Sequence, residues 1–361
     1  MEKLALTSAL LDWYRTVRRD LPWRKSQDPY PIWISEVMLQ QTRVETVIPY
    51  FDRFMKQYPT VDALAAAQEE DVLKYWEGLG YYSRVRNLHA AVREVAAKYG
   101  GEIPRTYEEM RALPGVGPYT VGAVLSIAYG LPIPAVDGNV LRVIARLFVL
   151  EEDIAHARTR SKVEIIVSEL IPSEFAGDFN QALMELGATV CIPRTPKCTE
   201  CPLAVGCAAY SSGRQSELPY KKSKKPPRIE ERVVFLVRNA KGDVLIRKRP
   251  DKGLLSGLWE LPHFSAPTEG VFQLTESHLT SERSGEVWAV AHELLSDAPR
   301  QISFVRNYTH VFSHVIWKLT LFVVEGRGTF IPQSPYTWMS ASQREQYTFG
   351  QVFNKIFADL D

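Results

Sequence analysis

The sequence predicts a two-domain protein whose first half is all-α and whose second half is α+β. Apolar residues recur at three- and four-residue spacing between residues 4 and 188, as in amphipathic helices. After residue 230 the chain changes to runs of β-branched and aromatic residues, such as RVVFLVRN and SHVIWKLTLFVV. Between the halves lies KKSKKPPR, in which two prolines prevent a regular helix. We expect domains at 1–215 and 230–361, joined by a basic linker at 216–229 that either is simply solvated or touches phosphate.

The composition is that of a globular protein with room for two ordinary cores. The chain has 361 residues, of which 45% are hydrophobic and 24% are charged. Its longest apolar stretch, 116–136, is repeatedly interrupted by glycine and proline, and its N-terminus lacks a hydrophobic signal core. We therefore expect a cytoplasmic protein without a membrane partner. The net charge of +1 does not decide nucleic-acid binding, which depends on where basic residues lie.

Helix starts are marked in the first half by hydroxyl residues, with Thr60 and Ser83 as candidate caps and Thr106 with Glu109 as a capping box. The segment LPGVG then separates the helix begun at Thr106 from one expected at about 118–129. Its glycines, Gly115 and Gly117, permit a tight turn with exposed backbone, so the amides of the second helix can meet a phosphate. A hairpin used only for packing is the alternative.

All four cysteines fall within a single loop, with the spacing C-x6-C-x2-C-x5-C. Disulfides are the weakest interpretation, because the chain looks intracellular and has no cysteine elsewhere to pair with. Zinc and an iron-sulfur cluster both accept four thiolates, so chemistry alone leaves the two open. The proposed ligands are Cys191, Cys198, Cys201 and Cys207.

Two carboxyl groups lie in contrasting contexts. Glu36 is in ISEVMLQQT, a mostly apolar helix whose surroundings would raise its pKa. Asp137, in PAVDGNVLRVIARLF, directly precedes an amphipathic helix whose amides and dipole would keep it ionised. Such a pair can act as an acid and as an ionised stabiliser in glycosidic-bond cleavage. The ordinary alternatives are a solvated surface glutamate and an N-cap aspartate.

In the same order along the chain, SEVMLQQT, LPGVG, VDGNV and the cysteine loop resemble the endonuclease III and MutY superfamily of DNA glycosylases. The resemblance implies a helix-hairpin-helix glycosylase domain whose cysteine loop holds a four-iron four-sulfur cluster. It further implies that Glu36 protonates adenine and helps to activate water, while Asp137 stabilises the cationic sugar. Asn139 would orient the neighbouring groups.

The position of Tyr119, in GVGPYT, separates branches of that superfamily. The enzymes that also cut the DNA strand carry a lysine here, whose amine forms a Schiff base with the sugar. A phenol cannot do this. We therefore expect a monofunctional glycosylase, although without the resemblance Tyr119 would suit simple packing at a helix start.

Extruding a base requires side chains that fill the gap left in the duplex. By resemblance the candidates for DNA contact in two short loops are Gln41, Thr42, Leu79 and Tyr81, with Gln41 and Tyr81 favoured for the gap and Tyr82 expected in the core. The adenine pocket would be formed by Trp23, Arg24 and Gln181. A core position suits Trp23 equally well.

The second half resembles a Nudix fold, beginning at RVVFLVRN with a turn at Gly242. The glutamate-rich magnesium helix of Nudix hydrolases should follow ELP, but the chain reads HFSAPTEGVFQLTESHLTSERSGEVW, so we expect a recognition module and not a hydrolase. The segment YTHVFSHVIWKL resembles the loop with which MutY-type enzymes detect oxidised guanine, through Phe312, Ser313 and His314. An ordinary strand pair is the alternative.

The resemblance as a whole implies a monomeric base excision repair enzyme that flips out and removes adenine. Its partner would be double-stranded DNA in which adenine is mispaired with 8-oxoguanine or guanine. Two rivals belong to other classes: a bifunctional glycosylase-lyase, which Tyr119 disfavours, and a non-catalytic iron-sulfur DNA-binding protein, which the presence of Glu36 and Asp137 disfavours.

Overall fold

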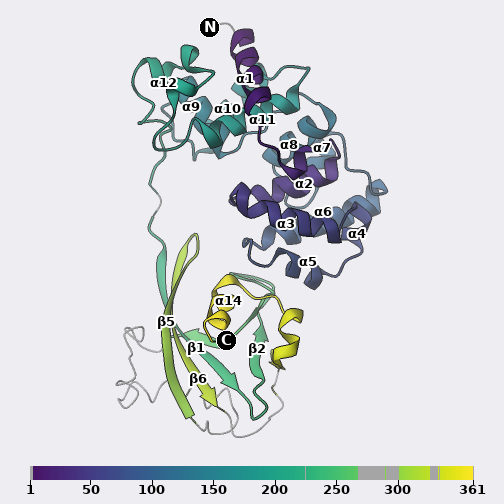
Figure 1. Cartoon of the computed structure of the whole chain (residues 1–361), viewed down its shortest axis with the longest axis vertical. Helices are drawn as coiled ribbons and strands as arrows, with labels where there is room; N and C mark the ends of the chain where they lie inside the picture. The colour runs from purple at the N-terminus through teal and green to yellow at the C-terminus, as the bar shows by residue number, and fades with distance from the viewer. Residues whose placement is uncertain are drawn as a thin grey trace. The chain divides into compact units, whose positions relative to one another are not determined.

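The computed structural model describes residues 3–223, 225–266, 289, 301–325, 332 and 334–360. The chain divides into two compact units, Met1–Ser223 and Lys224–Asp361. The first is built of helices and the second around a sheet, which confirms the predicted all-α and α+β halves (Figure 1). No helix in the described part of the chain is both long enough and apolar enough to cross a membrane.

The helical unit falls into two groups of helices, one formed by α2–α8 and one by α1 with α9–α12 (Figure 1). The second group packs around an apolar core that includes Tyr14, Ile144 and Phe179. The helices are α1 (Lys3–Val17), α2 (Pro29–Leu39), α3 (Val44–Gln57), α4 (Val61–Ala65), α5 (Glu69–Trp76), α6 (Ser83–Tyr99), α7 (Tyr107–Ala112), α8 (Pro118–Tyr129), α9 (Gly138–Leu147), α10 (Ala157–Leu170), α11 (Ala176–Thr189) and α12 (Ala208–Ser211).

Most of the predicted caps are present. The hydroxyl of Thr60 accepts from the amide of Ala63 at 3.2 Å, and that of Thr106 accepts from the amide of Glu109 at 3.3 Å. The prediction for Ser83 is wrong, because Ser83 is the first residue of α6 and Tyr82 occupies the cap position. Tyr82 itself is buried, as expected.

The hairpin between α7 and α8 depends on one glycine more than on the other. Gly115 has φ +70°, and a Cβ there would meet the Cβ of Asn87 at 2.4 Å, so only glycine fits. Gly117 has φ −96°, which any residue adopts, but no atom lies within 4 Å of where its Cβ would be. Gly117 therefore leaves the start of α8 open to an approaching group.

The second unit is organised around a mixed sheet with the strand order β3-β2-β1-β6-β5, in which β4 pairs with β1 and β7 with β2. Strands β1 and β6 run parallel along their full length, and the other pairs are antiparallel. Gly242, at φ +84°, occupies the expected turn between β1 and β2. The strands are β1 (Arg228–Arg238), β2 (Val244–Lys248), β3 (Trp259–Glu260), β4 (His263–Ser265), β5 (Gln301–Val311), β6 (Val315–Glu325) and β7 (Tyr336–Met339).

Alternation along the strands gives each face of this sheet an apolar core. On β1, Val234 and Leu236 belong to the core that also contains Phe353 of α14 (Gln351–Ala358), whereas Val233 and Phe235 belong to the other. In a Nudix hydrolase the magnesium helix would fall within residues 263–288. Most of this segment lies outside the described residues. Its absence therefore stays a prediction from the sequence.

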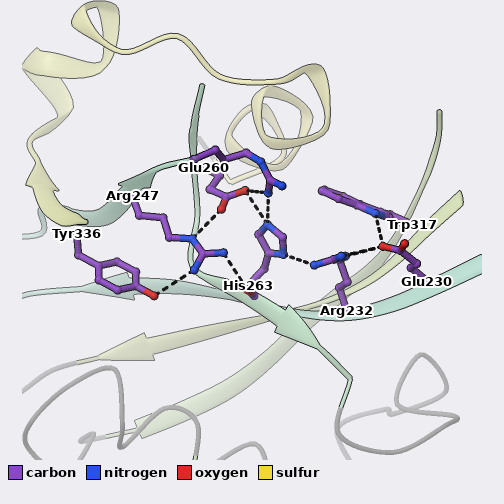
Figure 2. Close-up of polar contacts among 8 residues, drawn as sticks. Glu230, Arg232, Arg247, Glu260, His263, Trp317 and Tyr336 are labelled. Carbon is purple, nitrogen blue, oxygen red and sulfur yellow. Dashed lines mark hydrogen bonds and ion pairs between the residues drawn. The ribbon is translucent and has the colours of Figure 1, made fainter. Parts of the chain in front are cut away.

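A buried polar cluster lies at the sheet of this unit (Figure 2). The carboxylate of Glu260 accepts from Arg247 at 2.7 Å and pairs with Arg249 at 2.5 Å. Burial opposes ionisation of Glu260, but His263 and the two arginines outweigh it and lower the pKa of Glu260 to about 2. The neutral tautomer of His263 with its proton on Nε2 donates to Glu260 at 2.7 Å and accepts from Arg232 at 3.2 Å. Each of these side chains thus has a hydrogen-bond or ion-pair partner within the cluster.

The predicted reading loop is the tip of the β5–β6 hairpin. The amide of Phe312 donates to the carbonyl of Val315 at 2.8 Å, which closes the turn. The Phe312 ring is half-buried against Trp317, with ring centres 5.0 Å apart, while Ser313 and His314 are exposed. The Trp317 indole is joined to the buried polar cluster through Glu230 (Figure 2). Its Nε1 donates to Oε2 of Glu230 at 3.0 Å.

Candidate active site

A cavity of about 530 Å³ opens in the helical unit, lined by residues of α2, α8, α9 and α11. This volume is within the range of sites that enclose a small ligand. The structure brings to its wall every residue predicted for catalysis or for the adenine pocket: Glu36, Tyr119, Asp137, Asn139, Trp23, Arg24 and Gln181.

Glu36 is held inside the protein by an apolar helix. Its helix α2 begins at the Asp28 cap and at Pro29, which suits a first turn, and the Glu36 residue is only 5% exposed. Burial raises its pKa to about 7, and the nearby Asp137 carboxyl adds to the rise, against the lowering effects of Tyr119 and Arg24. The surface interpretation is therefore wrong. A carboxyl group with this pKa can give up a proton near neutral pH.

Tyr119, in the first turn of α8, connects to this acid directly. Its hydroxyl donates a short hydrogen bond to Oε2 of Glu36, and Sδ of Met184 lies 3.4 Å away. Burial and the adjacent carboxyl groups raise the pKa of Tyr119 well above its usual value. The phenol is therefore a neutral donor that stabilises the ionised form of Glu36.

Asp137 is both the N-cap of α9 and part of the cavity wall. One carboxylate oxygen accepts from the amide of Val140 and the other from Nδ2 of Asn139, each at 2.8 Å. We expected these groups to keep Asp137 ionised, but burial has the larger effect and raises its pKa, while the hydrogen bonds to Val140 and Asn139 lower it. The sequence shows the cap but not the extent of burial.

Asn139 is fixed from two further directions. Its Oδ1 accepts from Arg142 at 2.9 Å, and the same guanidinium donates to the carbonyls of Cys191 at 2.7 Å and Gly187 at 2.8 Å. A Cβ on Gly187 would lie 2.5 Å from the Cβ of Asn139. Close packing of α11 therefore helps to hold the amide against Asp137.

The wall also contains an ion pair that the sequence analysis missed. Glu185, buried on α11, binds Arg19 at 2.6 Å and Arg24 at 2.8 Å. Burial alone would raise the pKa of Glu185, but the two arginines lower it. Arg24 also donates to Oε1 of Gln181 at 3.1 Å. The signal available in the sequence was that Glu185 follows Gln181 by one helical turn.

Trp23 has the core position that was one of its two expected interpretations, and its part in an adenine pocket stays a prediction. It is buried and packs edge to face on Phe51, with ring centres 5.3 Å apart, and it also lines the cavity.

The two loops predicted to contact DNA differ in position. Gln41 and Thr42 line the cavity, and Gln41 is exposed. Tyr81 lies outside the cavity wall with 46% of its surface exposed. Leu79 is buried, and its amide donates to the carbonyl of Trp76 at 3.1 Å while its carbonyl accepts from Arg84 at 3.4 Å, so the structure does not present it to a partner.

The four cysteines come together around a cavity of about 30 Å³. Burial, together with the other thiols, raises the pKa of Cys201 to about 11, so without a bound cation this thiol would stay protonated. Within the described ranges no set of three or more His, Cys, Asp or Glu side chains is arranged to hold one metal ion. Four thiols that line one cavity are a donor set that fits a metal cluster.

The helical unit combines an open helical hairpin with a buried pair of carboxyl groups. These two features define the class of this protein. Residues 34–172 match the model of the HhH-GPD superfamily of base excision DNA repair proteins, and residues 233–359 match a NUDIX domain. The fold resembles a thermostable thymine-DNA glycosylase, with a TM-score of 0.54 and 32% identity over 58% of this chain and 97% of that one. It also resembles endonuclease III in a trapped covalent complex with DNA, with a TM-score of 0.50 and 26% identity over 59% and 99%.

Relatives that match most of this chain identify the family within that class. The chain is 36% identical to the adenine DNA glycosylase of Rattus norvegicus, over 96% of this chain and 76% of the relative. It is 34% identical to that of Homo sapiens, over 99% and 74%, and 32% identical to that of Schizosaccharomyces pombe, over 93% and 85%. The chain belongs to the adenine DNA glycosylase family.

Proposed function

We propose that this enzyme hydrolyses the bond between deoxyribose and adenine where adenine is mispaired with 8-oxoguanine or guanine. The observation that carries the proposal is the buried pair Glu36 and Asp137 in one cavity, with a phenol on the first. Burial raises the pKa of Glu36 to about 7, and the Tyr119 hydroxyl bonded to it would stabilise the carboxylate left after proton transfer, which supports Glu36 as the acid.

The geometry supports a sequence of proton movements. Glu36 protonates the imidazole ring of the flipped adenine, which weakens the glycosidic bond. The hydrogen bond from Tyr119 then stabilises the carboxylate that remains, and this carboxylate can accept a proton from the attacking water. Asp137, held by Asn139, faces the cationic sugar that forms as the base departs.

The same cavity supports a monofunctional enzyme. No lysine is among the described residues that line it, and Tyr119 stands where a lyase would need its amine. The product would therefore be an abasic site in an intact strand.

We assign to Cys191, Cys198, Cys201 and Cys207 a four-iron four-sulfur cluster, for which their shared cavity is the support. Such a cluster supplies a rigid covalent cross-link for the loop, and no step of base removal is routed through it. The partner is double-stranded DNA, gripped by the α7–α8 hairpin and by the loops around Gln41 and Tyr81.

The exposed tip of the β5–β6 hairpin is our candidate for detection of the opposite base. Oxidised guanine carries a hydrogen on N7, where guanine has only an acceptor. The exposed Ser313 hydroxyl lies 3.3 Å from Nδ1 of His314. When the hydroxyl donates to this nitrogen, its lone pairs remain available to accept from the hydrogen on N7. The half-buried Phe312 would hold the tip in shape.

One gel tests the function. Duplexes with adenine opposite 8-oxoguanine, guanine or thymine are incubated with the enzyme and then treated with alkali or left untreated. We expect strand cleavage only after alkali and only for the first two. Cleavage without alkali would indicate a lyase, and an enzyme that binds but never cleaves would be a non-catalytic binder. Glu36→Gln should keep binding and lose base release, and retained turnover would refute the assignment of the acid.

A further inference from the structure

Two loops of the helical unit share an unusual backbone conformation. Gln41 follows α2 with φ +59°, and Tyr81 precedes α6 with φ +50°. Side chains other than glycine avoid this left-handed region, so each loop needs support from its surroundings. These are also the two side chains that the proposed function places in the gap left by the extruded base.

The support comes from one side chain, Arg84, in the first turn of α6. Arg84 is only 9% exposed although it carries a charge. From the end of α2 and the first loop it binds the carbonyls of Val37 at 3.0 Å, Met38 at 2.9 Å and Gln40, and the hydroxyl of Thr42 at 3.3 Å. From the second loop it binds the carbonyls of Leu79 at 3.4 Å and Gly80 at 3.2 Å.

Three of the groups that accept from Arg84 are backbone carbonyls at the end of α2. Val37 and Met38 belong to the last turn of α2 and Gln40 is its C-cap. Carbonyls at a helix end lack partners within the helix and attract a cation. Arg84 therefore closes the end of the helix that carries Glu36. Arg84 also contacts the aromatic ring of Tyr81 in the second loop, because its guanidinium lies 5.4 Å from the centre of that ring. Burial lowers the pKa of Arg84 only to about 10, so it stays charged.

We propose that Arg84 is a positioning residue that joins the loops of Gln41 and Tyr81 into one rigid unit, so that both side chains enter the duplex together when the base is extruded. The inference rests on the proposed function, because it assumes that these loops contact DNA. A lysine at this position could not replace the arginine, since its compact ammonium lacks the flat fork of donors that spans both loops.

The test compares Arg84→Lys with Arg86→Lys as a matched control. Arg86 lies on the same helix and pairs with Glu69 of α5 at 3.1 Å. Base extrusion is followed by the fluorescence of 2-aminopurine placed opposite 8-oxoguanine, and chemistry by the single-turnover release of adenine. We expect R84K to lower the fluorescence rise and to slow release by about tenfold or more, and R86K to match the parent enzyme.

A double-mutant cycle separates positioning from a general loss of structure. If Arg84 acts through Tyr81, then Arg84→Lys should slow release by less than about threefold in a chain that already carries Tyr81→Ala. Equal effects in both backgrounds, or unchanged fluorescence and rate in R84K, would overturn the inference. If R84K does not fold, Thr42→Val removes one acceptor and leaves the cation in place. It should weaken extrusion in the same direction, and parental behaviour would again overturn the inference.

The outcome for the parent enzyme distinguishes the two proposals. If the parent releases no adenine from any duplex, the proposed function has failed. If the parent releases adenine and R84K does so equally well, only the role of Arg84 has failed.

Discussion

Replacing Glu36 by glutamine should make the protein more stable at pH 8 while abolishing base release. Glu36 has a pKa of about 7 in the folded protein, against 4.5 for an unperturbed glutamate. Because one pKa unit corresponds to about 1.4 kcal/mol, keeping Glu36 ionised costs the folded state about 3 kcal/mol. Glutamine carries no charge and keeps an oxygen that can accept from Tyr119, so the variant avoids this cost.

The sign follows from the direction of the shift. A raised pKa means that the folded protein holds its proton more tightly than the unfolded chain does between about pH 4.5 and 7. The stabilisation by Glu36→Gln should therefore be nearly zero at pH 4.5, grow up to pH 7, and stay at about 3 kcal/mol above it. Urea unfolding followed by helical circular dichroism at pH 4.5 and pH 8 measures this difference.

Glu185→Gln is the matched control, since it changes a second buried glutamate on the same cavity. Arg19 and Arg24 lower the pKa of Glu185, so its removal should destabilise the fold at pH 8 by about 3 kcal/mol. The reasoning is refuted if Glu36→Gln is less stable than the parent protein at pH 8, or if its effect does not change with pH.

Three further predictions concern other parts of the molecule. Tyr119→Phe removes the donor that favours ionised Glu36, so the alkaline limb of single-turnover rates should move up by about 1 to 2 pH units, and an unmoved limb would exclude this contact. Gly187→Ala places a methyl against Asn139 and should slow base release about tenfold with DNA binding retained, whereas a parental rate would contradict the packing. Glu260→Gln should destabilise the second unit to urea by roughly 3 kcal/mol at pH 7, and because the pKa of Glu260 is lowered, the deficit should narrow below pH 4.5; a constant deficit would contradict the charge pairing.

Much of the fold followed from local patterns. The helix over Pro118–Tyr129 begins at a proline and ends before a glycine, and both signals act on the backbone of their own turn. The mistake at Ser83 arose because a hydroxyl residue fits the first helical turn as well as the cap before it. The sequence therefore located the helices better than it located their ends.

The site was predicted less evenly. Motifs named Glu36, Tyr119 and Asp137, but their contacts join positions far apart in the chain, such as Glu36 and Tyr119, which are 83 positions apart. The ion pairs of Glu185 were missed because no short segment contains both partners. The burial of Leu79 was missed as well, because burial depends on how the folded chain packs around a residue.

The sequence by itself determined the class of each half, the order of its motifs and which residues are the candidates for the chemistry. Periodicity, turn residues and cysteine spacing depend on near neighbours, and near neighbours are what a sequence displays. Only the tertiary structure decided that Glu36 and Asp137 are desolvated, and only it revealed that one arginine, Arg84, binds the backbone of both the Gln41 and the Tyr81 loop. The physical reason is that burial and hydrogen bonding between distant segments exist only after the chain has folded.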